Sequence, residues 1–69
     1  MKKIFSSISI AIPAFNEEEN LEWVVKDTLK QLPQYFRDFE IIIVNDGSTD
    51  KTGKIADKLA HKSNKIRVV

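Results

Sequence analysis

The chain has 69 residues, which is enough for one small domain. A domain of this size buries only about 60% of the surface that its unfolded chain exposes, so its stability is marginal. It has no cysteine, which excludes disulfides and thiolate metal sites, and the single His61 excludes a histidine cluster. With 42% hydrophobic and 30% charged residues, the composition is that of a folded globular protein. The formal net charge of +1 argues neither for nor against nucleic acid, and we assign no nucleic-acid partner.

The amino terminus begins with basic residues followed by an apolar stretch, which is how a secretory signal starts. Serines at positions 6, 7 and 9 interrupt the stretch, so it lacks the continuous apolar region of a signal. No segment reaches the length of a membrane-spanning helix. We therefore expect a cytoplasmic chain, with any attachment to the cytoplasmic face of a membrane coming from segments outside residues 1–69.

The first half of the chain predicts a strand followed by a helix. Residues 7–12 form the strand, and Pro13 is expected to end it because proline cannot donate to a central ladder. A helix from residue 17 or 20 to residue 32 follows, since apolar side chains recur there at helical spacing. They are Leu21, Val24, Val25, Thr28, Leu29 and Leu32. Pro33 ends this helix.

The second half repeats this order. We expect Tyr35 and Phe36 to pack beneath the sheet. Residues 39–44 are almost continuously apolar, the pattern of a strand buried on both faces of a parallel sheet. Ser48 or Thr49 is expected to cap a second helix, with Asp50 in its first turn. This helix has an apolar inward stripe and outward lysines. The stripe is Thr52, Ile55, Ala56, Leu59 and Ala60.

Residues 65–69 predict the opening of a third strand. Alternation of strands and helices predicts an α/β fold with a parallel sheet and right-handed crossovers. Three short strands leave exposed sheet edges. We expect residues 1–69 to be a single, incomplete amino-terminal segment of a longer domain. The remainder of that domain or an oligomer partner would cover the edges.

Two polar segments directly follow the first two strands. They are Pro-Ala-Phe-Asn-Glu-Glu-Glu-Asn at residues 13–20 and Asn-Asp-Gly-Ser-Thr-Asp at residues 45–50. Ligands bind at the carboxyl ends of strands in open α/β sheets, so both segments should face one crevice. The first segment lacks the glycine-rich loop that lets a phosphate approach helix amides, and its glutamates would repel a phosphate. The pair therefore predicts the nucleoside half of a nucleotide site.

The side chains of both segments suit a base and its ribose. Phe15 can offer an apolar face to a base, and Pro13 holds the turn rigid. Asp46 can accept a hydrogen bond from an imide N–H, and Glu17 can accept from ribose hydroxyls. Gly47 allows a sharp turn after Asp46 because glycine tolerates positive φ.

Simpler structural roles are open for the same residues. Asp46 and Gly47 could form only a turn, although two motifs after consecutive strands favour ligand contact. Phe15 could instead pack against the following helix as a hydrophobic staple. Residues 17–19 could be a solvated first turn that satisfies the helix dipole. Trp23 lies off the apolar stripe, and we favour contact with a segment outside the chain.

Residues 9–50, with Pro-Ala-Phe-Asn-Glu and Val-Asn-Asp-Gly-Ser-Thr-Asp, resemble the start of an inverting family 2 glycosyltransferase of the GT-A type. The branch they resemble contains dolichyl- or polyprenyl-phosphate mannosyl- and glucosyltransferases, which move a sugar from a UDP- or GDP-sugar to a lipid phosphate. The resemblance implies a Rossmann-like β-α-β-α-β start of the GT-A fold, with parallel strands.

The resemblance also assigns the site. It implies that Pro13, Phe15 and Glu17 line the nucleoside pocket and that Asp46 reads the base. Family members often have two acids in succession there, whereas this chain has Asn45 before Asp46. The resemblance further implies that the diphosphate is bound through Mg²⁺ or Mn²⁺ held by an Asp-x-Asp motif further along, followed by a catalytic base and an acceptor site.

We therefore expect no catalytic residue and no metal ligand within residues 1–69, and no turnover by this segment alone. The alternative is a non-catalytic, truncated or minimal α/β scaffold or interaction module. A receiver-like fold would need paired acids near the end of the first strand, and the glutamates of this chain come later.

Overall fold

A computed structural model describes residues 5–69, so the basic start considered above as a signal lies outside the described residues. The elements are β1 (Phe5–Ala14), α1 (Leu21–Gln31), a 3₁₀ helix η1 (Leu32–Gln34), β2 (Phe36–Asn45), α2 (Thr52–Lys62) and β3 (Ile66–Val68). All pairings are parallel, and the strand order is β1-β2-β3. The predicted β-α-β-α-β order and parallel sheet are confirmed.

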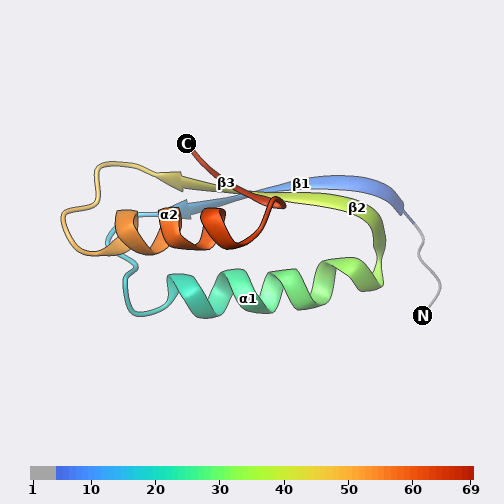
Figure 1. The fold of residues 1–69 in the computed structure, drawn as a ribbon, viewed down its shortest axis with the longest axis horizontal. Helices are drawn as coiled ribbons and strands as arrows, with labels where there is room; N and C mark the ends of the chain where they lie inside the picture. The colour runs from blue at the N-terminus through green and yellow to red at the C-terminus, as the bar shows by residue number, and fades with distance from the viewer. Residues whose placement is uncertain (1–4) are drawn as a thin grey trace.

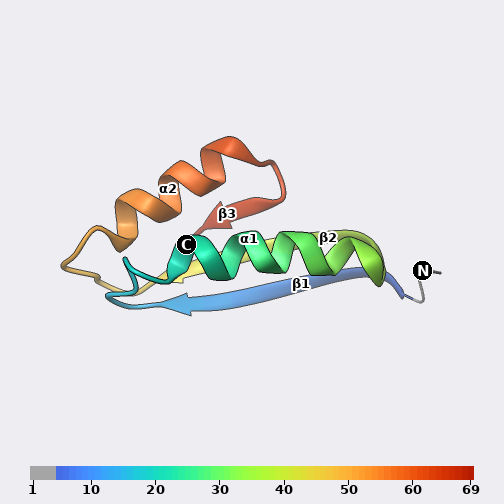
Figure 2. The same cartoon turned by 90° about the horizontal axis from the view of Figure 1, so that it is seen from below.

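Both helices lie on the same face of the sheet, which gives the molecule two layers (Figures 1 and 2). The core lies between these layers, where Ile41 and Ile43 of β2 are fully buried against Val25 and Ala56 of the helices. Burying an isoleucine side chain stabilises the fold by about 1.5–3 kcal/mol relative to leaving it exposed. The predicted outward lysines of α2 are exposed. None of the helices within residues 5–69 is both long and apolar enough to span a bilayer.

The prediction that the second strand is buried on both faces is wrong for the described residues. Side chains alternate across the sheet, so Ile43 faces the helices while Val44 faces the other way and is 36% exposed. The physical reason is the topology: with both helices on one face, nothing within residues 5–69 packs over the other.

Several predicted boundaries also differ. Pro13 does not end β1 but pairs with Val44 inside it, which is tolerated because β1 is an edge strand of this sheet. Tyr35 is 38% exposed rather than packed beneath the sheet, whereas Phe36 packs partly against the core. The Phe36 ring stacks on that of Phe5, with centroids 5.2 Å apart.

The helices begin later than predicted. α1 starts at Leu21, because the carbonyl of Glu17 accepts the N–H groups of Asn20 and Leu21 in a turn that precedes the helix. α2 starts at Thr52, beyond the predicted caps at positions 48 and 49. The side chains of those two residues bond to the first polar segment instead.

Candidate functional site

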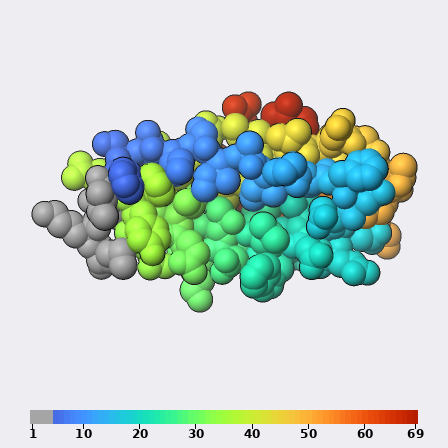
Figure 3. Space-filling model, turned by 180° about the vertical axis from the view of Figure 1, so that it is seen from behind, coloured from blue at the N-terminus to red at the C-terminus, as the bar shows by residue number. Residues whose placement is uncertain are grey.

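The two polar segments meet at the carboxyl edge of the sheet. The first segment ends β1 and continues through the β1–α1 loop, residues 15–20, and the second ends β2 and continues into the β2–α2 loop, residues 46–51. Both lie at the left end of the molecule in Figure 1 and side by side at the right end in Figure 3. The predicted convergence of the two motifs is therefore present in the fold.

Side chains of the second motif and of Thr52, the first residue of α2, bind the backbone of the first motif. Three successive N–H groups donate across the gap: Asn16 to Ser48 Oγ at 3.1 Å, Glu17 to Thr52 Oγ1 at 2.7 Å, and Glu18 to an Asp50 carboxylate oxygen at 3.3 Å. Because these donors are already paired, they do not form the open row of amides that a phosphate needs. The β1–α1 loop is therefore built as something other than a phosphate cradle.

The Asn16 side chain of the first loop in turn binds the second loop. Its Oδ1 accepts the backbone N–H of Thr49 at 2.9 Å and the Thr49 hydroxyl at 3.4 Å. Its φ of 52° is left-handed, a conformation in which asparagine is enriched. Bonds running both ways between the loops fix their relative position.

Asp50 anchors the start of α2. Its carboxylate accepts the Thr52 backbone N–H at 2.9 Å and also the Thr52 hydroxyl. Reduced solvent contact raises the pKa of Asp50, but the hydrogen bonds from Thr52 and from the Glu18 backbone outweigh it and leave the pKa below the ordinary 3.8. Sequence reasoning expected Ser48 and Asp50 to serve the turn and helix start. It missed their bonds to the other loop, which depend on residues more than 30 positions away.

Asp46 differs from its neighbours in this network. It is exposed, and none of the hydrogen bonds among residues 5–69 involves its carboxylate. The following Gly47 has a φ of 71°, which favours glycine, and open space surrounds the position of a Cβ. The turn thus presents a carboxylate that is available at the edge of the sheet.

The other predicted site residues are also exposed at this edge. Phe15 is 59% exposed and is not among the side chains that pack against the core, which argues against the hydrophobic staple. Pro13 and Glu17 are exposed as well. The fold thus brings Pro13, Phe15, Glu17 and Asp46 to one edge, and their roles in binding stay predictions.

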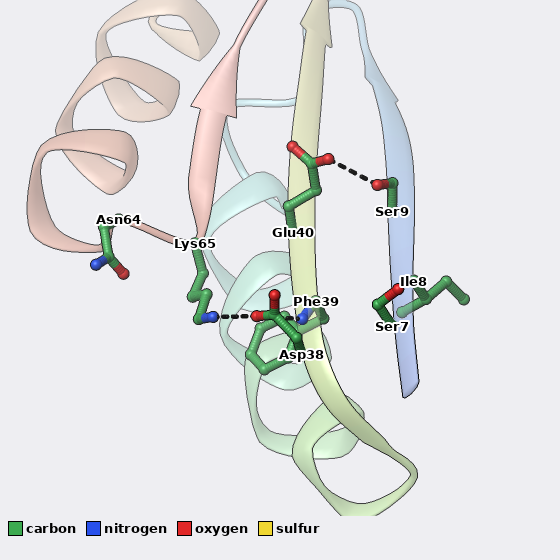
Figure 4. A pocket seen from close by; sticks show the side chains of 8 residues that line it. All are labelled: Ser7, Ile8, Ser9, Asp38, Phe39, Glu40, Asn64 and Lys65. Atoms are coloured by element: carbon green, nitrogen blue, oxygen red, sulfur yellow. Dashed lines mark hydrogen bonds and ion pairs between the residues drawn. The ribbon is translucent and has the colours of Figure 1, made fainter. Parts of the chain in front are cut away.

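A separate hollow lies on the open face of the sheet, near the amino ends of the strands (Figure 4). The charged side chains that line it are paired: Lys65 with Asp38, and Glu40 with the neighbouring Arg67 at 3.0 Å. Glu40 also accepts a hydrogen bond from the Ser9 hydroxyl at 2.7 Å. Lys65 also lies over the Phe39 ring. Because its charges are internally paired and it lies at the opposite end from the two motifs, this hollow is not the predicted site.

No three histidine or acidic side chains within residues 5–69 lie where they could share a metal ion. The expectation of Mg²⁺ or Mn²⁺ held by residues elsewhere therefore stays a prediction.

The fold and the paired loops define a Rossmann-like α/β protein with a polar site at the carboxyl edge of its sheet. The sequence profile described as Glycosyl transferase family 2 matches residues 9–69. The chain belongs to glycosyltransferase family 2.

Individual relatives agree with this assignment. The chain is 36% identical over 56 residues to an undecaprenyl-phosphate 4-deoxy-4-formamido-L-arabinose transferase of Proteus mirabilis, covering 81% of this chain and 17% of the relative. It is 38% identical over 69 residues to human dolichyl-phosphate beta-glucosyltransferase, covering 90% and 21%. It is 37% identical over 62 residues to glycosyltransferase AglD of Haloferax volcanii, covering 87% and 10%. The chain thus spans about a fifth or less of the length of these relatives.

Proposed function

We propose that this chain is the nucleoside-binding part of an inverting glycosyltransferase. That enzyme would move a hexose from a UDP- or GDP-sugar to a polyprenyl or dolichyl phosphate. Family membership supports the reaction class. The acceptor class is supported by relatives named for undecaprenyl-phosphate and dolichyl-phosphate substrates.

The observation that carries the proposal is the free, exposed carboxylate of Asp46 at the same edge as the hydrogen-bonded β1–α1 loop, which exposes Phe15. An ionised carboxylate accepts strongly from an imide N–H of uracil or from the N1–H of guanine. The ring of Phe15 would stack on the base, and Glu17 would accept from the ribose hydroxyls. Pro13 would hold the start of the loop in place.

We assign the diphosphate to chain outside these residues. The N–H groups of Asn16, Glu17 and Glu18 are occupied, and the carboxylates of the β1–α1 loop would repel phosphate. A divalent cation would neutralise the leaving diphosphate. Residues beyond this chain would hold that cation, so residues 1–69 alone would bind a nucleotide weakly and would not transfer sugar.

Calorimetric titration of the chain with UDP and GDP, with and without Mn²⁺, tests this proposal. We expect saturable binding of one nucleotide that changes little on adding Mn²⁺. Asp46→Ala should weaken binding roughly ten-fold or more, because a charge-assisted hydrogen bond is lost. Asp57→Ala, which removes an exposed carboxylate of α2, is the matched control.

Absence of binding by a folded chain would instead favour the alternative function, a non-catalytic α/β scaffold or interaction module. A circular dichroism spectrum recorded on the same sample separates that result from simple unfolding.

A further inference from the structure

The side chain of Asn45 is an unusual feature of the site. Asn45 is the last residue of β2, and it follows the alternation that buries Ile41 and Ile43 against the helices. Its Oδ1 is buried and has no hydrogen-bond partner within residues 5–69. A buried acceptor without a donor destabilises a fold, so its presence at this position needs an explanation.

The backbone of Asn45 is held from both sides. It pairs with Ala14 of β1, and its N–H donates to the carbonyl of Val69 at 3.1 Å. Asp46 is the first residue beyond this fixed point, and Gly47 then turns the chain with a φ of 71°. One end of the β2–α2 loop is therefore anchored directly before the base-reading carboxylate.

The other end of the loop is anchored by the first turn of α2. Thr52 is fully buried and is hydrogen-bonded to Glu17 and Asp50. At the next position, a Cβ added to Gly53 would lie 3.1 Å from Nδ2 of Asn45, closer than an ordinary van der Waals contact. Alanine favours a helix more than glycine does, so the glycine is explained by this close approach rather than by helix formation.

We propose that Asn45 and Gly53 form a positioning pair that sets the direction of the Asp46 carboxylate and hence its hydrogen bond to the base. This inference rests on the proposed function. The loop of residues 46–51 is short, and the residues that flank it, Asn45 and Gly53, lie close together. Their separation therefore sets the distance between the two ends of the loop. Moving α2 away by a few tenths of an ångström would shift Asp50 and Thr52, and with them the bonds that hold the β1–α1 loop.

In this arrangement the shape of the Asn45 side chain and its ability to accept a hydrogen bond matter more than the fact that it is uncharged. Rotating the amide about its terminal bond exchanges its oxygen and nitrogen, so either atom can face the first turn of α2. N–H groups at the start of a helix have no partners within the helix and favour an acceptor. Asn45→Asp keeps the shape and supplies an acceptor, so it should preserve the position of the turn, whereas Asn45→Ala should release it.

A double-mutant cycle on the chain tests the pair. The variants are Gly53→Ala, Asn45→Ala and the double variant, with Asn45→Asp as the conservative replacement and Lys54→Ala as the control. Lys54 is exposed and adjacent to Gly53. Affinity is measured for the nucleotide that the wild type binds, UDP or GDP. It is also measured for the analogue methylated at the base nitrogen, which lacks the N–H that Asp46 would accept.

We expect Gly53→Ala to weaken nucleotide binding about five- to ten-fold and to reduce the preference for the unmethylated base, as a misdirected charge-assisted hydrogen bond would. In the Asn45→Ala background the same change should have less than about a two-fold effect, since the contact is gone. Asn45→Asp and Lys54→Ala should bind as the wild type does. Loss of base preference marks positioning, because a purely structural change would weaken both ligands alike.

Melting temperatures of the same variants check that each one is folded. Gly53→Ala should lower the melting temperature in the wild-type background and raise it in the Asn45→Ala background. Equal effects of Gly53→Ala in both backgrounds would overturn the inference. So would binding that depends on Asp46 but is unchanged by Gly53→Ala, and that result leaves the proposed function standing. Absence of nucleotide binding by the folded wild type would overturn the proposed function and the positioning role with it.

Discussion

The hydroxyl of Thr52, at the start of α2, accepts the backbone N–H of Glu17 at 2.7 Å across 35 positions of sequence. Thr52 is the one polar residue that is fully buried within residues 5–69. It also donates to Asp50, so a single side chain joins both loops to the start of α2. The Thr52 hydroxyl is therefore the buried member of the set of hydrogen bonds that joins the two loops.

Thr52→Val should destabilise the chain by about 1–3 kcal/mol, because valine keeps the shape but leaves the Glu17 N–H without a partner. Urea unfolding followed by circular dichroism measures the change. Thr49→Val is the comparison: it removes a hydroxyl that bonds to Asn16 at 3.4 Å, but Thr49 is exposed and its backbone N–H keeps the 2.9 Å bond to Asn16, so the cost should be smaller. Thr52→Ser retains the hydroxyl and should fall between the wild type and Thr52→Val. A Thr52→Val variant as stable as the wild type would show that the hydroxyl does not hold the two loops.

The layout of the fold was readable from the sequence because periodicity reports burial directly. The apolar stripes of both helices predicted the faces that contact the sheet, and the lysines of α2 are exposed as expected. The position of Pro13 and the exposure of Val44 were not readable in this way. Whether a strand lies at an edge, or has both faces covered, depends on neighbours that the local sequence does not specify.

The candidate site was predictable at the level of which residues converge, because carboxyl ends of parallel strands share one edge. The bonds of Asn16, Asp50 and Thr52 across the two loops were not predictable, since they depend on the separation and twist of β1 and β2. The close approach of Asn45 to Gly53 was not predictable either, because it depends on where α2 packs against the sheet.

Phe15→Ala should weaken nucleotide binding while leaving stability almost unchanged. Stacking of a base on an aromatic ring contributes about 1–3 kcal/mol by alanine substitution, and the 59% exposed ring contributes little to the core. Calorimetric titration and thermal melting of the same sample measure the two effects. Tyr35→Ala removes an exposed aromatic ring at the opposite end of the sheet and should leave affinity unchanged. A large fall in melting temperature for Phe15→Ala would instead support a packing role.

Substitutions on adjacent residues of β2 test the two-layer fold. Ile43→Ala should cost about 2–5 kcal/mol of unfolding free energy, because it leaves a cavity between the sheet and the helices. Val44→Ala should cost less than about 1 kcal/mol, because its side chain lies on the open face. Urea unfolding of the dilute chain gives both values. Equal costs for the two variants would mean that the open face is covered in solution.

Acid should destabilise the chain through carboxylates paired on the open face. The hydrogen bond from Ser9 and then the Arg67 guanidinium lower the pKa of Glu40 below 4.5, and the Lys65 ammonium lowers the pKa of Asp38 below 3.8. A carboxyl group whose pKa is lower in the folded than in the unfolded chain stabilises the fold at pH values above its unfolded pKa. This stabilisation is lost as the pH falls through the folded pKa. The loss should therefore begin near pH 4.5 and continue below 3.8.

The midpoint of urea unfolding, measured across this pH range, tests the predicted loss of stability with falling pH. The midpoint should be steady above the window and should fall within it, and Glu40→Gln should remove part of the fall. Glu19→Gln is the matched control, since Glu19 is exposed in the β1–α1 loop. Because these pairs are solvent-exposed, 1 M salt should screen them and reduce the difference between Glu40→Gln and the wild type. A midpoint that rises as the pH falls, or a fall that Glu40→Gln leaves intact, would contradict the role of this carboxylate.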